Sequence, residues 1–175
     1  MRTFIAIELG NEVKNVLAAA QEQAAALCRK GNYTPKENFH LTLHFLGEVT
    51  TETAGMSYPF SLRLDRIGFF PRGREGILWA GVEKSDALFR LFRNLETCLG
   101  RQGFGREKKG LRPHITLGRE VEPYRHFSDV QKKVSLEAAE IPVTSISLME
   151  SVRMGRKLIY RPLVVQRLKD KRVSR

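Results

Sequence analysis

Residues 39–46, Phe-His-Leu-Thr-Leu-His-Phe-Leu, form the stretch on which the fold prediction depends. The tetrapeptide His-Leu-Thr-Leu at 40–43 recurs in a related form, His-Ile-Thr-Leu, at 114–117. Side chains two positions apart share one face of a β-strand. We therefore expect His40 and Thr42 to lie on one face of a strand, and the second tetrapeptide to repeat this arrangement.

The opposite phase of the first strand is apolar, which predicts that its other face is buried in the core. The residues in this phase are Phe39, Leu41, Leu43 and Phe45. If the two halves of the chain face each other across a cleft, an imidazole and a hydroxyl from each tetrapeptide converge on one small volume.

An amphipathic helix is predicted ahead of each tetrapeptide. The first covers residues 12–29, with Asn11 as its N-cap and Gly31 beyond its last turn. The second is opened by Ser85 as N-cap and closed by Gly100. Their apolar stripes are Val13, Val16, Leu17, Ala20, Ala24, Leu27 and Cys28 in the first helix, and Leu88, Leu91, Phe92, Leu95, Cys98 and Leu99 in the second.

Short apolar or alternating runs predict the strands. They lie at 3–9, 39–46, 60–66, 77–82, 114–118, 143–149 and 159–168. Gly155 is expected to turn the final hairpin, and Pro162 indicates an edge strand or a bulge. Because a strand–helix–strand unit is followed by a similar one, the order of elements predicts two lobes.

Composition limits the class of protein. A chain of 175 residues, 42% of them hydrophobic, supports one domain over 1–175, and no apolar stretch reaches the roughly 20 residues of a membrane span. We expect a cytoplasmic monomer with a basic, frayed tail at 167–175. The net charge of +11 favours nucleic acid as the partner. Cys28 and Cys98 occupy apolar positions of the predicted helices, so we expect them in the protein core and not in a disulfide or a metal site.

Two imidazoles and two hydroxyls suit the cleavage of a phosphodiester. In-line displacement at phosphorus needs one base and one acid, and His40 and His114 can supply both. Thr42 and Thr116 can donate hydrogen bonds to the non-bridging oxygens. Arg119 can pair with the same oxygens if Gly118 permits a bulge or if the strand has ended there, because strict alternation would turn the arginine toward the core.

The other two histidines are predicted to lie outside the catalytic pair. His40 and His44 share a face in strict alternation, but residues four apart on a strand are separated by about 13 Å, too far to bind one metal ion together. We expect no metal or other cofactor. His44 is predicted at the edge of the cleft, and His126 on a surface loop beside Arg125.

A basic loop over residues 103–113 is a candidate RNA contact, although such runs are often only solvated. Its candidate residues are Arg106, Lys108, Lys109 and Arg112. Phe39 or Tyr160 could stack on a base, and the phase of Phe39 favours burial.

The sequence resembles the RNA 2′,3′-cyclic phosphodiesterases, also called the 2′-5′ RNA ligase family, of the 2H phosphoesterase superfamily. The resemblance covers most of the chain and rests on residues 2–9, 35–47, 70–71, 78–82, 112–119 and 155–160. It implies a bilobal α+β fold with mainly antiparallel sheets flanking a central cleft. It also implies metal-independent opening of 2′,3′-cyclic phosphates to 2′-phosphates, with His40 as proton donor and His114 as acceptor. Thr42, Thr116 and Arg119 match the phosphate-contacting positions of this family.

Two alternatives stay open at this point. The same histidines could join RNA ends through a 2′-5′ bond, or the basic cleft could bind RNA without catalysis. One segment departs from the family pattern, because residues 49–59 are too short and too rich in Thr, Gly and Pro for the helix that the family has there.

Overall fold

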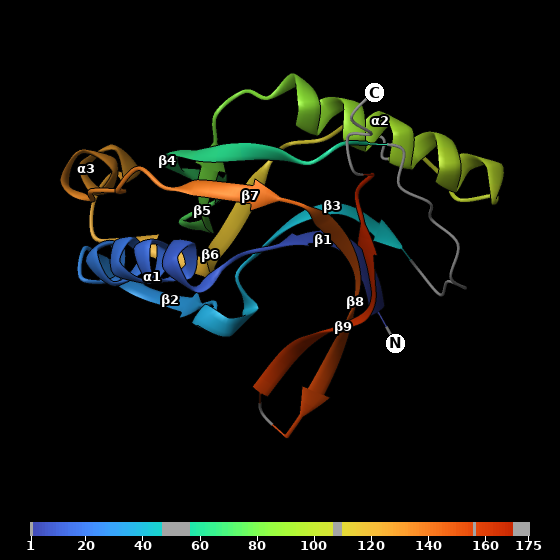
Figure 1. The fold of residues 1–175 in the computed structure, drawn as a ribbon. Helices are drawn as coiled ribbons and strands as arrows, with labels where there is room; N and C mark the ends of the chain where they lie inside the picture. Colours follow the sequence, from blue (N-terminus) through green and yellow to red (C-terminus); the bar gives the residue numbers. More distant parts are fainter. Residues whose placement is uncertain (1, 47–56, 107–109, 156, 170–175) are drawn as a thin grey trace.

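The computed structural model describes residues 2–46, 57–106, 110–155 and 157–169, which form β-strands, three α-helices and one turn of 3-10 helix (Figure 1). The strands are β1 (Arg2–Glu8), β2 (Cys28–Tyr33), β3 (His40–Leu46), β4 (Phe60–Arg72), β5 (Glu75–Val82), β6 (His114–Pro123), β7 (Glu140–Val143), β8 (Ser145–Met154) and β9 (Lys157–Arg167). The helices are α1 (Asn11–Ala25), the 3-10 turn η1 (Lys36–Asn38), α2 (Asp86–Arg101) and α3 (Phe127–Lys133).

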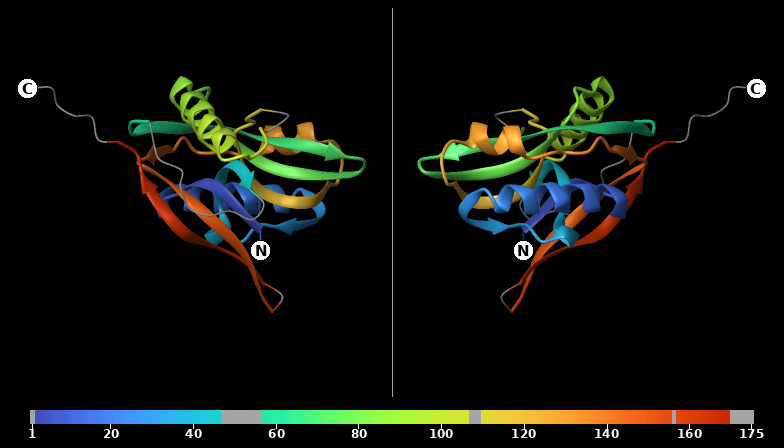
Figure 2. Two further views of the ribbon diagram at one scale, coloured as in Figure 1. Left: turned by 90° about the vertical axis from the view of Figure 1, so that its right-hand side faces the viewer. Right: turned by 90° about the vertical axis from the view of Figure 1, so that its left-hand side faces the viewer.

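The strands form two antiparallel sheets, so the predicted α+β class is confirmed. Sheet A has the order β3-β1-β8-β9, and sheet B has the order β2-β6-β5-β4-β7. The first tetrapeptide therefore lies on an edge strand of sheet A, and the second lies inside sheet B. The β8–β9 hairpin projects from the rest of the molecule, as both views of Figure 2 show.

Helix α1 is shorter than its apolar pattern predicts. It starts at Asn11 with Gly10 as N-cap, and it ends at Ala25, so the prediction of Asn11 as N-cap is wrong. The chain then turns, and Cys28 is buried in β2 rather than in a helix. Pairing of β2 with β6 satisfies the backbone of these residues, which overrides the helical pattern of their side chains.

Helix α2 follows its prediction closely. The Ser85 hydroxyl accepts a hydrogen bond from the Leu88 amide at 3.2 Å, which confirms the N-cap. Gly100 lies inside the last turn instead of closing the helix, and Gly103 adopts the left-handed conformation (φ +86°) just beyond it. Five apolar side chains of α2 are buried in the core: Leu88, Leu91, Phe92, Leu95 and Leu99. Cys98 is half-buried on the same helix.

A β-bulge follows the histidine and threonine in each tetrapeptide. In β3, Ala6 pairs with Thr42 and Ile5 with His44, so Leu43 is an extra residue. In β6, Trp79 pairs with Thr116 and Leu78 with Gly118, so Leu117 is the extra residue. The bulge near Gly118 is thus confirmed, and β3 contains a second bulge that was not predicted from the sequence.

The bulge in β3 reverses the alternation beyond it. Phe45 is 66% exposed, so its predicted burial is wrong. His44 is 5% exposed and buried on the opposite face, so its predicted place at the cleft edge is also wrong. Phe39, Leu41 and Leu43 precede this reversal and are buried as predicted.

The final hairpin confirms two expectations. Gly155 has a φ of +61° at its turn, and Pro162 lies at a register shift on the edge strand β9. The tail is less frayed than predicted at its start, because Leu168 is buried and its amide donates to the Thr144 carbonyl. Residues 170–175 lie outside the described part. Of the segment 49–59, only 57–59 are described, without helix or strand.

Candidate active site

Both tetrapeptides line one cleft between the sheets, with a volume of about 1140 Å³. Sheet A contributes His40 and Thr42 from β3, and sheet B contributes His114 and Thr116 from β6. Arg119 lines the same cleft, because the bulge in β6 returns its side chain to the face of His114. The predicted convergence of the two halves is therefore present in the structure.

The two imidazoles are held in the same way. His40 Nδ1 donates to the Asn38 carbonyl at 2.7 Å, and His114 Nδ1 donates to the Arg112 carbonyl at 2.7 Å. A carbonyl oxygen can only accept, so the proton of each neutral ring is on Nδ1. Each Nε2 atom is thereby left to exchange protons with a ligand. In the resting site, His40 Nε2 lies 3.0 Å from the Thr42 hydroxyl.

Aromatic rings pack against both imidazoles. The His40 ring lies 4.8 Å from the Phe4 ring and 5.0 Å from the Tyr160 ring, the second in an edge-on arrangement. The His114 ring makes an edge-on contact with Phe70 at 5.3 Å. Tyr160, which the sequence analysis offered as a base contact, therefore lies in the cleft and also confines His40.

The surroundings of His40 change its acidity. Burial lowers the pKa of the His40 imidazole below its ordinary value, because desolvation disfavours the charged ring. The hydrogen bond to the Asn38 carbonyl raises this pKa, and the positive charges of Lys14 and Arg119 lower it further. The neutral form of His40 is therefore favoured in the free protein.

Asn38 joins the β8–β9 hairpin to the start of β3. This residue is 4% exposed, and its side-chain amide donates to the Leu158 carbonyl at 2.7 Å and accepts from the Tyr160 amide at 3.3 Å. Because β3 and β9 are the two edges of sheet A, these bonds require that the sheet curl until its edges meet at this end. Asn38 was not among the site residues predicted from the sequence.

Gln21 of α1 supports the bulge of β6. Its side-chain amide donates to the Leu117 carbonyl at 2.7 Å and to the Thr34 carbonyl at 2.8 Å. The Thr34 amide also donates to the Leu117 carbonyl. The extra residue of the bulge thus has its carbonyl satisfied, which holds the backbone that directs Arg119 into the cleft.

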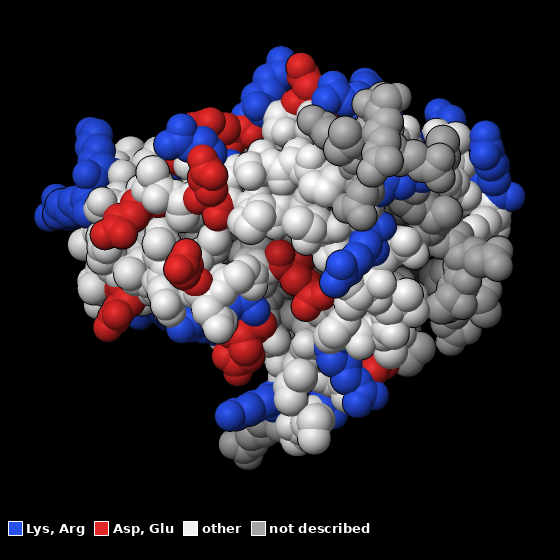
Figure 3. Space-filling model, in the orientation of Figure 1, with Lys and Arg blue, Asp and Glu red and all other residues white. Residues whose placement is uncertain are grey.

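The other predicted RNA contacts lie elsewhere or outside the described part. Arg106 and Arg112 are exposed and do not line the cleft, and Lys108 and Lys109 lie outside the described residues. Phe39 is 1% exposed, so it cannot stack on a base, whereas the unpredicted Phe45 lines the cleft. On the face in Figure 3, basic and acidic side chains are interspersed, so the net positive charge is not gathered into one patch there.

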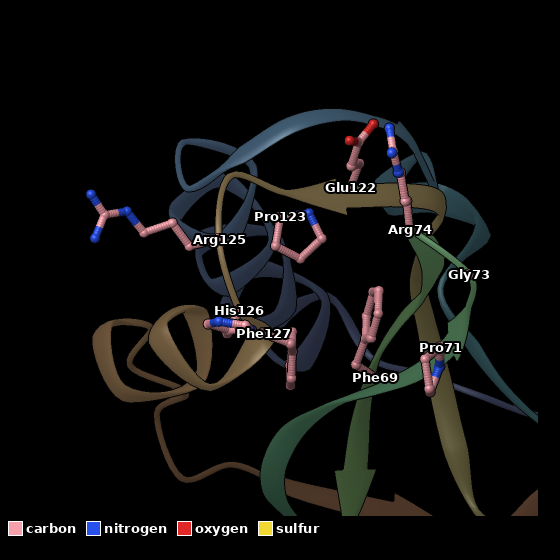
Figure 4. A pocket seen from close by; sticks show the side chains of 9 residues that line it. All are labelled: Phe69, Pro71, Gly73, Arg74, Glu122, Pro123, Arg125, His126 and Phe127. Carbon is pink, nitrogen blue, oxygen red and sulfur yellow. The ribbon is translucent and has the colours of Figure 1, made fainter.

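A second hollow, about 580 Å³, lies between the β4–β5 turn and the start of α3 (Figure 4). Phe69 and Phe127 stack at 4.9 Å against it, Glu122 and Arg74 lie close together at its upper end, and Arg125 points away. His126 is exposed on the loop beside Arg125, as predicted. This hollow contains no residue of either tetrapeptide.

The described residues contain no group of three or more His, Cys, Asp or Glu side chains placed to hold a metal ion. No helix among them is long and apolar enough to cross a membrane.

Comparison with known proteins places the chain in a family. Residues 12–154, which include both tetrapeptides, match the model of the 2′-5′ RNA ligase superfamily. The chain belongs to this superfamily. A relative from Thermotoga maritima, an RNA 2′,3′-cyclic phosphodiesterase, is 33% identical over 163 residues, which is 85% of this chain and 82% of that protein. A relative of the same name from Archaeoglobus fulgidus is 28% identical, over 94% of this chain and 99% of that protein.

Solved structures with the same fold support this placement. A crystal structure of a Thermus thermophilus protein matches with a TM-score of 0.79 and 27% identity, covering 98% of this chain and 100% of that one. Escherichia coli LigT in complex with 3′-AMP matches with a TM-score of 0.73 and 25% identity, covering 95% of this chain and 97% of that one.

Proposed function

We propose that this protein hydrolyses RNA 2′,3′-cyclic phosphate ends to 2′-phosphates by acid–base catalysis from two histidines, without a metal ion. The observation that carries the proposal is the pair of imidazoles in one cleft, each fixed through Nδ1 so that Nε2 is available. Two such groups suffice for the proton transfers of in-line displacement at phosphorus.

In the reaction, a water oxygen forms a bond to phosphorus as the bond between phosphorus and the 3′-oxygen breaks. His114 Nε2 accepts the proton of the water, and His40 Nε2 donates a proton to the departing 3′-oxygen. The product has a 2′-phosphate and a free 3′-hydroxyl. Proton exchange with solvent then restores both rings.

Other cleft residues bind the phosphate and the nucleoside. Thr42, Thr116 and Arg119 donate hydrogen bonds to the non-bridging oxygens, where negative charge is held during the displacement. Phe45 and Tyr160 offer aromatic surface to the terminal base. Arg112, Lys108 and Lys109 stay predicted contacts to the RNA beyond the cleft.

His40 must be protonated before it can act as the acid. Burial opposes this in the free protein, but a bound phosphate brings a negative charge close to the ring and favours the imidazolium. Substrate binding therefore prepares the proton donor.

The test uses purified protein and a short RNA that ends in a 2′,3′-cyclic phosphate, with the products resolved by chromatography. We expect 2′-phosphate ends, and a fall in turnover of about 10²–10⁴-fold for His40→Ala and for His114→Ala. A substrate with a better leaving group should partly rescue His40→Ala only, since the acid becomes dispensable. Rescue of His114→Ala instead would reverse the two roles. If the protein joins this RNA to a second RNA with a 5′-hydroxyl end, its function is that of a ligase. If it binds the RNA without any reaction, its function is RNA binding alone.

A further inference from the structure

The cleft has a second basic region, separate from the phosphate position at the two tetrapeptides. The residues that line the whole cleft include three arginines and no carboxylate. Arg119 lies beside the second tetrapeptide on β6, whereas Arg2 and Arg153 come from β1 and β8 of sheet A. The proposed mechanism gives a role to Arg119 but none to Arg2 or Arg153, so it uses only part of the positive charge in the cleft.

Arg2 and Arg153 lie around one hydroxyl. Arg2 pairs directly with Ser151 across β1 and β8, and Arg153 is two residues beyond Ser151, so all three side chains share the cleft face. Partners in an antiparallel pair have Cα atoms about 4.5–5.5 Å apart, close enough for both side chains to contact one ligand. Two guanidinium groups and a hydroxyl are the donors that a phosphate group takes.

No described carboxylate neutralises these two arginines. Other arginines of the described chain do have such partners, for example Arg161 with the buried Glu150 on the same hairpin. Neither Arg2 nor Arg153 forms an ion pair with any residue in the described ranges. Two cations of like charge in one concave surface, with no carboxylate partner in the described ranges, are stabilised when an anion binds between them.

Their position relative to the imidazoles fits a nucleic acid chain. Ser151 pairs with Tyr160, whose ring contacts His40, so the row Arg2–Ser151–Tyr160 leads across sheet A toward the catalytic ring. The cleft volume of about 1140 Å³ also exceeds the ~300–1,000 Å³ of ordinary small-molecule pockets. The site thus has room for more than a nucleoside with its cyclic phosphate.

We propose that Arg2, Ser151 and Arg153 form a second phosphate subsite, which binds the phosphate attached to the 5′-oxygen of the terminal nucleoside. This inference rests on the proposed function. It makes the preferred substrate an RNA end with at least one phosphate on the 5′ side, and it makes a bare nucleoside 2′,3′-cyclic phosphate a poor substrate.

Three substrates test the subsite: uridine 2′,3′-cyclic phosphate, the same compound with a 5′-phosphate, and the dinucleotide UpU with a 2′,3′-cyclic phosphate end. We expect kcat/KM for the two phosphate-bearing substrates to exceed that of the first by roughly tenfold or more, as charge-assisted hydrogen bonds allow. Arg2→Gln and Arg153→Gln should each reduce this ratio several-fold. They should also lower the slope of log kcat/KM against log salt by about one for these substrates.

Arg93→Gln is the matched control, because Arg93 is exposed on α2 and does not line the cleft. It should leave the ratio unchanged. Hydrolysis of the bare cyclic phosphate by each variant shows that the site is folded. Equal kcat/KM for all three substrates would overturn the subsite, and so would a preference that neither arginine variant reduces. Cleavage of none of the three by the wild-type protein would instead refute the proposed function.

Discussion

Replacing Asn38 by alanine should loosen the contact between the hairpin and His40. The Asn38 side chain holds Leu158 and Tyr160 of β9, while its backbone carbonyl holds His40 Nδ1. Alanine keeps the carbonyl but removes both side-chain bonds. The edge of the curled sheet then loses its connection to β3, and the Tyr160 ring is free to move away from the imidazole.

The hydrogen bonds give the magnitude. Each contributes about 1 kcal/mol net, and the side chain is buried, so Asn38→Ala should lower the free energy of unfolding by about 2–3 kcal/mol. Turnover should fall by roughly 10–100-fold, because a shift of about 1 Å in a catalytic group can cost that much. Water that reaches His40 should also raise the pKa of its imidazole toward the ordinary value, since burial is the largest cause of its lowering.

Urea denaturation measures the first effect, steady-state kinetics the second, and an NMR titration of the His40 ring the third. Asn32→Ala is the control, because Asn32 is exposed in β2, and it should change the free energy of unfolding by less than about 0.5 kcal/mol. The titration separates positioning from stability. If Asn38→Ala destabilises the fold but leaves both turnover and the His40 pKa unchanged, the proposed link from Asn38 to His40 is wrong.

Three further outcomes follow from the site. Because the pKa of His40 is lowered in the folded protein, the unfolded state binds more protons than the folded state as pH falls through 6.5. The free energy of unfolding should therefore decrease over this range. The decrease should be smaller in His40→Asn, which lacks the titrating ring. Gln21→Leu should lower the free energy of unfolding by about 1–3 kcal/mol, because it removes the donor to the Leu117 carbonyl. It should also reduce turnover, because the backbone that directs Arg119 into the cleft is no longer held. Glu22→Leu, at an exposed position of the same helix, is the control and should have neither effect. Incubation with EDTA should leave hydrolysis intact, and activity restored only by a divalent ion would contradict this expectation.

Local patterns predicted much of the fold. The apolar stripe of α2 and its Ser85 cap could be read from sequence, since both depend on residues within one helix. The strand pairing of residues 28–33 could not, because a partner strand far along the chain overrides the helical pattern there. The short helix α3 was also missed, since Val130 is its one buried residue and gives no periodic signal.

The features of the candidate site likewise divide into those that the local sequence predicted and those that it did not. The alternation in each tetrapeptide correctly placed a histidine and a threonine on the cleft face. Gly118 marked the bulge in β6, but no glycine marks the bulge in β3, so Phe45 was assigned to the wrong face. Asn38 was missed for a different reason, because its partners lie 120 and 122 residues away along the chain.

The two imidazoles share a backbone arrangement but differ in their surroundings, and this difference bears on the proposed division into acid and base. Both rings donate through Nδ1 to the carbonyl two residues earlier, and both have an aromatic edge contact. His40 is additionally packed against Phe4, and its pKa is lowered mainly by burial. An imidazolium of lowered pKa gives up its proton more readily, which helps most when the departing group is a poorly leaving ribose oxygen. His40 must first bind this proton, and the negative charge of the substrate phosphate close to the ring favours its binding. The anionic phosphate therefore opposes the effect of burial on the His40 pKa, and in the proposed mechanism the ring is protonated only when substrate is in the cleft.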